Sequence, residues 1–570
     1  MGESHSPFIN LYCIYVIDTQ VLIVGGGSVG LSLSAELAHH GVTSVVVEEQ
    51  PNVNPHPRAN AIACRTMEYY RRWGIADSLV AAGIPPENPA DYYWVSSLSG
   101  REIHRLSLPS QTQLETLRRT TEFSIDNRLH WSAYIKCNVG QNEVDQILRD
   151  HLDTLSQSQL KSGVRAVRYI EHDDHIETVL FDPVTSVESK ITSKFLVGCD
   201  GGRSVIRNQL GIAYEGDGDL AQFVSVYFRA PELMAAHPFG PANIYFPLHH
   251  DHAGYLINWD HGESWTYHIQ LKANESWDEV DAIARITNLL GAEIPITIES
   301  IQPWTAHALT ASSFGSGRVW LAGDAAHLFS PTGGFGMNTG VSDAVDLAWK
   351  LRGVIEGWGG PNLLPSYDIE RRPIGSRNTQ LAKELYERLA SVMELGDILD
   401  EESAEADQVR MTLKADLVEQ ESLIASFGVL LGYRYTNSPI CIADGTPEPE
   451  DHPQMYVPTS RPGHRAPHIW LTEDETLYDR FSVGFNLIRT NPSVDVSDLV
   501  AEATKRELPL AIVDIDTPET QIVYPCALTL VRPDLMVAWR ANLAPTTSED
   551  LWDKVTGHFS ISLGTDLDIR

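Results

Sequence analysis

Basic residues are scarce in this chain of 570 residues: 42 lysines and arginines stand against 76 aspartates and glutamates, a formal net charge of -34. A surface of that sign repels the phosphates of nucleic acids and of anionic lipid headgroups. We therefore expect no nucleic-acid partner and no stable association with a membrane.

Cysteine is equally sparse. The six cysteines lie far apart and form no CxxC pair. That spacing excludes a dense disulfide framework and the clustered ligands of a zinc site. We therefore expect reduced thiols, no metal site and a cytoplasmic location.

An early basic cluster and a long apolar run are also missing. No lysine or arginine precedes Arg58, so we expect neither a secretory signal nor an Arg-rich transit peptide. Residues 8–17 are apolar but too few to span a bilayer. We interpret them as an extra strand or as an extension ahead of the first strand.

What is present is an ordinary globular composition, 43% hydrophobic and 21% charged, in a chain long enough for two or three domains. The apolar run at 21–24 predicts a buried parallel strand, residues 28–40 have the spacing of a helix, and residues 44–47 predict a second buried strand. Together these segments predict a βαβ unit.

The turn of this unit carries a Gly-x-Gly-x-x-Gly motif at Gly25, Gly27 and Gly30. Gly25 permits a tight turn, Gly27 lets the backbone approach a pyrophosphate, and Gly30 lets the helix pack closely on the strand. The helix N-terminus then favours the negative charge of the pyrophosphate. Glu48, at the end of the second strand, is suited to bind a ribose. The ordered set predicts a dinucleotide site.

A second glycine-rich segment follows the strand predicted at 319–321. Asp324 ends that strand, where a carboxylate needs hydrogen-bond partners, and a ribityl chain offers hydroxyls. The glycines after Pro331 lead into a helix predicted over 339–356, whose N-terminus suits the electron-rich pyrimidine edge of a reduced flavin. A nicotinamide dehydrogenase has no need of this second site, so the pair of sites favours FAD.

The remaining patterns predict elements more coarsely. Alternation over 91–123 predicts β structure, and aromatic and β-branched residues over 221–310 predict an antiparallel sheet that binds the substrate. We also predict helices over 66–73, 141–151 and 368–395, a buried strand at 195–197 and a linker over 443–463.

Four segments of the chain match one known family. They are the βαβ unit, residues 58–68, residues 197–207 with the run Cys199-Asp200-Gly201, and residues 323–350. Together they resemble the FAD-dependent aromatic hydroxylases of the p-hydroxybenzoate hydroxylase fold, most closely the phenol, dichlorophenol and polyketide hydroxylases. The resemblance implies an α/β protein with a Rossmann-like FAD-binding domain, an inserted β-rich substrate domain and a C-terminal thioredoxin-like domain.

The same resemblance implies the extent of each domain. The FAD-binding domain would comprise residues 18–90, 130–215 and 310–400, the substrate domain 91–129 and 216–309, a linker with helices 401–460, and the thioredoxin-like domain 461–570. The last has no CxxC, so we expect a structural or dimer-contact role there and leave a homodimer open.

The resemblance also assigns cofactor contacts. Arg58 and Gln141 would contact the pyrophosphate or ribityl part of FAD, Asp324 the ribityl chain, and Asp200 both FAD and the nicotinamide cofactor. The turn that contacts the isoalloxazine through its backbone would comprise Pro331, Gly334, Gly336, Met337 and Asn338. No second Gly-x-Gly-x-x-Gly motif exists, so NAD(P)H would bind without a Rossmann domain of its own.

The catalytic base is the least defined part of the pattern. Asn60 stands near the place where phenol hydroxylases have an Asp and dichlorophenol hydroxylases a His, and an amide is no base at neutral pH. Tyr245 and His268, in the aromatic-rich region, are the other candidates, and ordinary packing is the favoured explanation for each of them.

The resemblance implies a monooxygenase that uses NAD(P)H and O2 to hydroxylate a phenolic or polyketide-derived aromatic through a C4a-hydroperoxyflavin. A Baeyer–Villiger or epoxidising monooxygenase of secondary metabolism on the same fold is one alternative. A flavin-binding protein without turnover is another, and the intact glycine turns argue against it.

Overall fold

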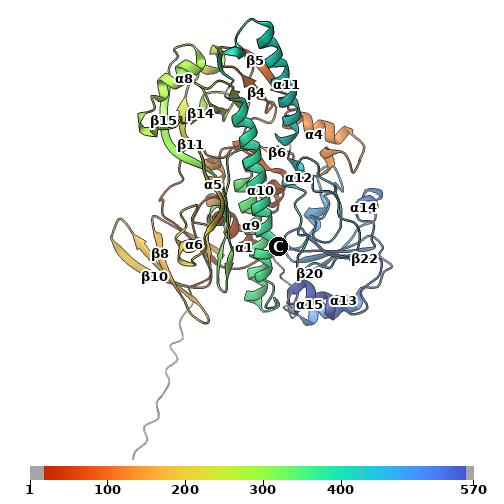
Figure 1. Cartoon of the computed structure of the whole chain (residues 1–570). Coiled ribbons are helices and arrows are strands. Elements are labelled where there is room, and N and C mark those ends of the chain that lie inside the picture. Colours follow the sequence, from red (N-terminus) through yellow and green to blue (C-terminus); the bar gives the residue numbers. More distant parts are fainter. Residues whose placement is uncertain (1–17, 394, 425, 560–570) are drawn as a thin grey trace, which may run out of the picture.

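The computed structural model describes residues 18–393, 395–424 and 426–559. It contains two large sheets, a smaller C-terminal sheet and the helices that join them (Figure 1). Helix α10 (Pro365–Val392) runs along the molecule beside the two large sheets, with the C-terminal domain on its other side. The apolar residues 8–17 lie outside the described range.

The first large sheet is the Rossmann-like core. Its strand order is β16 (Gly315–Ser316), β17 (Val319–Leu321), β10 (Val187–Gly198), β1 (Thr19–Val24), β2 (Ser44–Glu48) and β7 (Ser158–Ser162), with β8 (Arg165–Glu171) and β9 (Ile176–Asp182) beside β10. The strands from β17 to β7 run parallel. Parallel strands buried on both faces explain the continuous apolar runs of the sequence.

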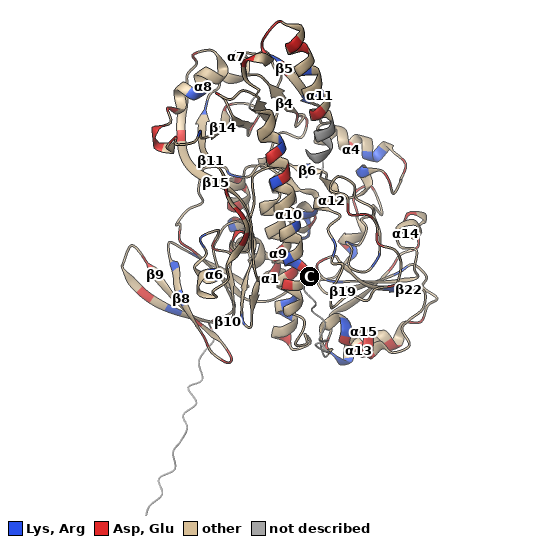
Figure 2. Cartoon of the chain, viewed as in Figure 1, with Lys and Arg blue, Asp and Glu red and all other residues tan. Residues whose placement is uncertain are grey.

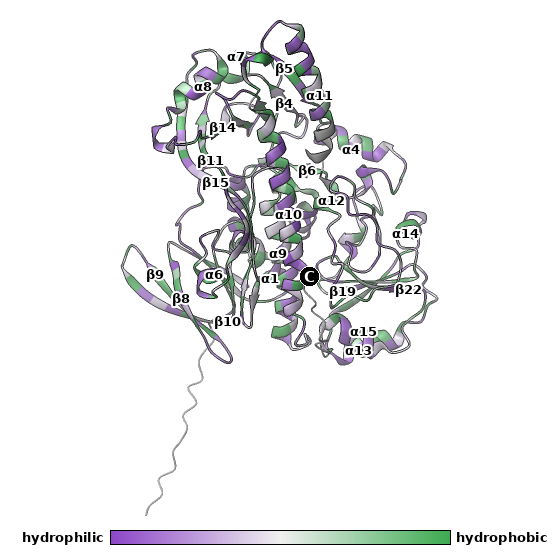
Figure 3. Ribbon diagram, in the orientation of Figure 1, coloured by the Kyte–Doolittle hydropathy of each residue, from purple (hydrophilic) through white to green (hydrophobic). Residues whose placement is uncertain are grey.

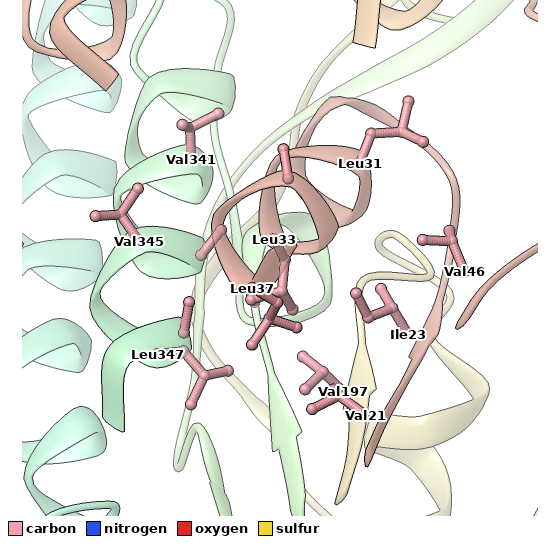
Figure 4. Close-up of a cluster of buried hydrophobic side chains, with 14 of the residues drawn as sticks. Val21, Ile23, Leu31, Leu33, Leu37, Val46, Val197, Val341, Val345 and Leu347 are labelled. Atoms are coloured by element: carbon pink, nitrogen blue, oxygen red, sulfur yellow. The ribbon is translucent and has the colours of Figure 1, made fainter. Parts of the chain in front are cut away.

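Helix α1 (Ser28–His39) is buried between this sheet and helix α9 (Gly336–Glu356), as Figure 4 shows. Leu33 and Leu37 of α1, Ile23 of β1 and Val345 of α9 are fully buried in one cluster. On the other side of α1 lies α5 (Gln141–Asp153), followed along the chain by β7. The two glycine-rich turns of the sequence therefore belong to helices that contact each other.

The second large sheet lies in the region predicted to bind the substrate. Its order is β18 (His327–Leu328), β15 (Thr297–Ala311), β11 (Tyr214–Arg229), β14 (Ser264–Gln270), β13 (Gly254–Asn258), β12 (Ile244–Pro247), β4 (Tyr92–Val95) and β5 (Glu102–Leu106). Its outer face packs on α8 (Ala282–Leu290) through an apolar cluster. The other face, which we call the inner face, packs on α10 and α11 (Ala404–Ile424) and on the segment 54–60.

The C-terminal domain has the predicted thioredoxin-like order. Strands β19 (Phe485–Arg489) and β20 (Leu510–Asp514) are parallel, β21 (Leu528–Val531) and β22 (Val537–Ala541) are antiparallel to their neighbours, and the order in the sheet is β20-β19-β21-β22. The helices are α13 (Ser497–Lys505), α14 (Pro518–Val523) and α15 (Ser548–Thr556). The predicted linker 443–463 forms no helix and no strand, and residues 401–460 contain α11 and α12 (Phe427–Leu430).

Two fully buried arginines fasten this domain to the flavin domain. Arg465 forms an ion pair with Glu68 of α2 (Cys64–Arg72). Arg532 contacts Asp346 of α9 at 2.9 Å and Glu370 of α10 at 2.6 Å. Each arginine is buried away from water and paired with a carboxylate of the other domain. Loss of either partner would therefore leave an uncompensated buried charge at the contact between the domains.

Two predictions of secondary structure were wrong in part. Within 91–123 only β4 and β5 are strands, while α4 (Gln111–Thr120) is a helix that begins at a capping box formed by Ser110 and Gln113. The capping box satisfies two backbone N–H groups at the helix start, a signal that outweighs the alternation.

The helix predicted from residue 339 begins earlier, at Gly336. A side chain at Gly340 would lie 2.6 Å from Val29, so this glycine allows α9 to approach α1 rather than ending the helix. The small elements β3 (Ile62–Ala63), β6 (Lys136–Cys137), α3 (Ala76–Ala82), α6 (Val205–Gln209) and α7 (Leu233–Ala236) complete the two large domains.

Charged and hydrophilic residues are prominent on the long helix α10. Acidic and basic residues alternate along α10 in Figure 2, and Figure 3 shows the same helix as mostly hydrophilic. No helix within the described ranges is long and apolar enough to cross a membrane.

Candidate functional site

The first glycine turn is shaped by contacts that exclude side chains at two positions and leave a third open. Gly25 has φ +109°, and a Cβ there would lie 2.2 Å from the carbonyl oxygen of Cys199. A Cβ at Gly30 would lie 2.0 Å from the carbonyl oxygen of Gly25. At Gly27 no protein atom lies within 4 Å of that position. The protein therefore leaves room beside Gly27, at the uncapped N-terminus of α1, where helix N–H groups attract an anion.

Glu48 stabilises this turn. Its carboxylate accepts hydrogen bonds from the backbone N–H of Gly26 at 2.6 Å and of Gln50 at 2.8 Å. Each carboxylate oxygen has a further lone pair, so the predicted ribose contact stays a prediction that these bonds permit.

Asp145 is a site residue that the sequence reasoning missed. It lies on α5, one turn after Gln141, and accepts a short hydrogen bond from the Ser28 hydroxyl in the first turn of α1. Burial raises the pKa of Asp145 to about 7, against the hydrogen bond from Ser28 and the charges of Arg149 and Arg58. The i, i+4 spacing from Gln141 places both on one face of α5, which was a signal available in the sequence.

Arg58 and Asp324 are brought together from distant parts of the chain. Both side chains are exposed, and no ion pair of either is found among the described residues. Desolvation of the Asp324 carboxyl group raises its pKa. The nearby charges of His327 and Arg58 act in the opposite direction but are outweighed. Gln141 joins them because its backbone N–H donates to the carbonyl of Ala59 at 2.9 Å. A cation and an acid without partners, beside the open space at Gly27, suit the polar chain of a dinucleotide.

The side chain of Asn338 fixes the turn at 331–338 through hydrogen bonds. The Asn338 side chain donates to the carbonyls of Ala61 at 3.0 Å and Gly334 at 2.8 Å, and accepts from the N–H of Ala63 and the hydroxyl of Thr66, both at 2.8 Å. All its capacity is used within the protein. The predicted flavin contacts of this turn are therefore left to the backbone, at an α9 N-terminus without a side-chain cap.

A buried acid supports the second glycine turn. Asp343 accepts from the N–H of Gly323 at 3.2 Å and from Arg371 Nε at 2.8 Å, and lies 2.6 Å from His327 Nε2. The charges of His327 and Arg371 hold the pKa of Asp343 below its usual value against the effect of its burial. Asp343 thereby fixes the strand end that presents Asp324.

The carboxylate of Asp200 has a structural use. It accepts from the Ser204 hydroxyl at 2.5 Å and from the N–H groups of Val205 and Ile206 at 2.7 and 3.2 Å, and so caps α6. Burial nevertheless raises its pKa. The predicted contact of Asp200 with FAD and nicotinamide would have to share these oxygens.

The segment 54–60 crosses the inner face of the second sheet. His56 bonds through its two ring nitrogens to Ser300 on β15 and Ser225 on β11, each at 2.7 Å. Further along, the Asn60 amide contacts Asn243 at 3.4 Å. The segment thus connects Arg58, a predicted cofactor contact, with the sheet.

Asn60 belongs to a polar chain rather than acting as a base. Asn243 continues to the hydroxyl of Tyr92 at 3.4 Å, which accepts from Lys136 Nζ at 2.7 Å. This chain holds the edge of the inner face to β6.

The two other catalytic candidates lie on opposite faces of the sheet. Tyr245 is fully buried on the outer face, stacks on Tyr93 and donates to the carbonyl of Gly240 at 2.7 Å. The sheet lies between Tyr245 and the segment 54–60, so this position does not favour a catalytic role, which stays a prediction. His268 lies on the inner face and stacks on Tyr255.

Known proteins share this arrangement over most of the chain. A family model for an FAD binding domain matches residues 18–382, and a second, for the C-terminal domain of aromatic-ring hydroxylases, matches residues 459–560. The chain is an FAD-dependent monooxygenase of the aromatic-ring hydroxylase family.

Named relatives of this chain are monooxygenases and hydroxylases. A 4-methyl-5-nitrocatechol 5-monooxygenase from Burkholderia sp is 31% identical, over 92% of this chain and 94% of the relative. The FAD-dependent monooxygenase apdD from Emericella nidulans is 31% identical over 93% of this chain and 88% of the relative. A solved ternary complex of aklavinone-11 hydroxylase with FAD and aklavinone has a TM-score of 0.79 and 26% identity, covering 95% of this chain and all of that one.

FAD therefore fits the residues of the site. The open space at Gly27, the two helix N-termini without side-chain caps, and the unpaired Arg58 and Asp324 are polar features of the kind that an FAD site needs. The roles of the individual residues stay predictions.

One cluster departs from the expectation of no metal ligands. His249, His250 and Asp251 place ligand atoms within 4.8 Å of one another. Asp251 already pairs with Lys272 and His249 with Asp397, each at 2.9 Å, and the cluster lies at the surface.

Proposed function

We propose that this monooxygenase uses NAD(P)H and O2 to hydroxylate a phenolic aromatic, including fused-ring polyketide-derived ones. The observation that carries the proposal is the inner face of the second sheet, whose aromatic side chains lie across the segment 54–60 from the flavin turns. Phe223 stacks on Trp304 at 4.3 Å and meets Tyr386 of α10 edge-on, while Phe246 and Tyr255 continue the face. Such a wall suits a flat aromatic ring.

The chain's own residues would hold FAD and keep water out. Arg58, Asp324 and the α1 N-terminus would bind the pyrophosphate and ribityl parts, and the backbone of 334–338 would hold the isoalloxazine edge. When bound, FAD would supply the redox and oxygen chemistry. The aromatic wall would fix the substrate ring near it, because orientation and exclusion of water favour the transfer.

NAD(P)H would bind transiently. The two large sheets contain one Gly-x-Gly-x-x-Gly turn, which the FAD would occupy. We therefore propose that NAD(P)H binds only transiently. Asp200 is the residue predicted to contact both FAD and the nicotinamide cofactor. The residue ranges predicted for the domains, a homodimer and a location in the cytosol are further proposals of the same kind.

Stimulated oxidation of NADPH and NADH tests the function. The purified yellow holoenzyme should oxidise one of them slowly alone and faster with a phenolic substrate, whose mass should rise by one oxygen. An Asp324→Ala variant serves as control, since it should lose the flavin. FAD that neither nicotinamide reduces, with any aromatic present, would contradict the proposal.

A further inference from the structure

His268 lies on the central inner face, and neither of its two ring nitrogens has a hydrogen-bond partner among the described residues. The side chain is 4% exposed. A neutral imidazole carries one donor and one acceptor, and leaving both unpaired in the interior is costly. Such groups in a native structure require an explanation, and a bound ligand that supplies the missing hydrogen bonds is one.

The position of His268 faces the flavin domain. Its neighbours on β14, Trp265, Tyr267 and Ile269, belong to the outer cluster with α8. Side chains alternate along a strand, so His268 projects from the opposite face. On that face it is paired across the strands with Ser225, the residue to which His56 is bonded.

The ring of His268 is held by aromatic contacts alone. It stacks on Tyr255 with centroids 4.4 Å apart and meets Trp304 edge-on at 5.8 Å. The neighbouring His56 uses both its nitrogens on serine hydroxyls, so it is not free to satisfy His268. Trp304 Nε1 is likewise buried without a partner. Aromatic surface and unsatisfied polar atoms therefore coincide at one place on the sheet.

We propose that His268 is a substrate-binding residue that exchanges a hydrogen bond with a hydroxyl or quinone oxygen on a fused-ring aromatic lying against Tyr255 and Trp304. The inference rests on the proposed function and adds to it the residue that orients the substrate. Burial lowers the pKa of His268 to about 3, so the imidazole stays neutral through the physiological range. A neutral ring orients the substrate and does not serve as the proton acceptor for a phenol.

His268→Phe tests the proposal because phenylalanine keeps the ring and its stacking but removes both nitrogens. The probes are aklavinone, 1-naphthol and naphthalene, titrated into the holoenzyme while the flavin absorption spectrum is followed. We expect the dissociation constants of aklavinone and 1-naphthol to rise about tenfold in the variant, the value of one hydrogen bond of about 1.4 kcal/mol. Naphthalene, which has no oxygen, should bind both proteins equally, and His268→Gln should recover part of the loss.

His237→Phe is the matched control. His237 is also a buried histidine with an unpartnered Nε2, but it lies in the outer layer beside Tyr245. It should leave all dissociation constants unchanged. Equal affinities of wild type and His268→Phe for both oxygenated probes, with stimulated NAD(P)H oxidation intact, would overturn this inference alone. A wild-type holoenzyme that none of the probes perturbs or stimulates would overturn the proposed function and the inference with it.

Discussion

Gly27→Ala should separate the affinity for FAD from the stability of the fold. A Cβ at Gly27 meets no protein atom within 4 Å, and its φ of -85° is one that alanine adopts freely. The apoprotein should therefore melt within about 2 °C of wild type. Alanine lowers the conformational entropy of the unfolded chain, which stabilises the fold slightly, and it is a slightly poorer N-cap residue than glycine, which destabilises it by a similar amount. The methyl group would occupy the space assigned to the pyrophosphate. Losing one charge-assisted hydrogen bond there, worth about 1.5–3 kcal/mol, weakens FAD binding about tenfold to a hundredfold.

Flavin fluorescence titration of the apoprotein and thermal melting provide the two readouts. Gly25→Ala should instead destabilise the apoprotein, because its Cβ would overlap the carbonyl of Cys199 at 2.2 Å. Gly262→Ala, on a surface turn where the nearest atom to a Cβ is 3.4 Å away, should change neither readout. Wild-type affinity of Gly27→Ala for FAD would refute the placement of the pyrophosphate.

Three more variants probe the supporting residues. Asp324→Ala should weaken FAD binding about tenfold or more in the same titration, and unchanged affinity would remove Asp324 from the site. Asp145 has its pKa raised to about 7 from 3.8, so the folded state holds an extra proton; the stability this confers is present below about pH 4 and is lost as the pH rises through 7. Asp145→Asn should flatten that decline in melts of the apoprotein between pH 5 and 8, whereas an unaltered decline would assign it to other groups. Arg532→Met removes the buried guanidinium that pairs with Asp346, Glu370 and Asp534 and leaves Lys350 as the remaining cation beside Asp346 and Glu370. It should cost about 3–5 kcal/mol in the free energy of unfolding by urea. A loss below about 1 kcal/mol would contradict a stabilising role of this buried network.

Local patterns in the sequence were enough to predict the flavin domain. The run 21–24, the glycine turn and Glu48 are consecutive, and their roles depend on the backbone of one βαβ unit. The second glycine turn was likewise recognisable from its own residues, whereas the thioredoxin-like C-terminal domain was predicted only from the resemblance.

Contacts between distant segments were beyond the sequence. The partners of Asn338 lie some 270 residues away, at Ala63 and Thr66, and no local spacing announces them. The same holds for Arg532 with Asp346 and Glu370. Tyr245 and His268 are equally aromatic and equally buried, and only the register of the sheet separates the outer from the inner face.

The fate of the oxygen atoms tests the central claim most directly. The holoenzyme is supplied with NADPH, a phenolic aromatic and ¹⁸O2 in unlabelled water, and the product is analysed by mass spectrometry. The account predicts a product that carries one ¹⁸O atom for each nicotinamide oxidised in fully coupled turnover. A product whose added oxygen comes from water, or bound FAD that supports no oxygen transfer to any aromatic, would contradict it.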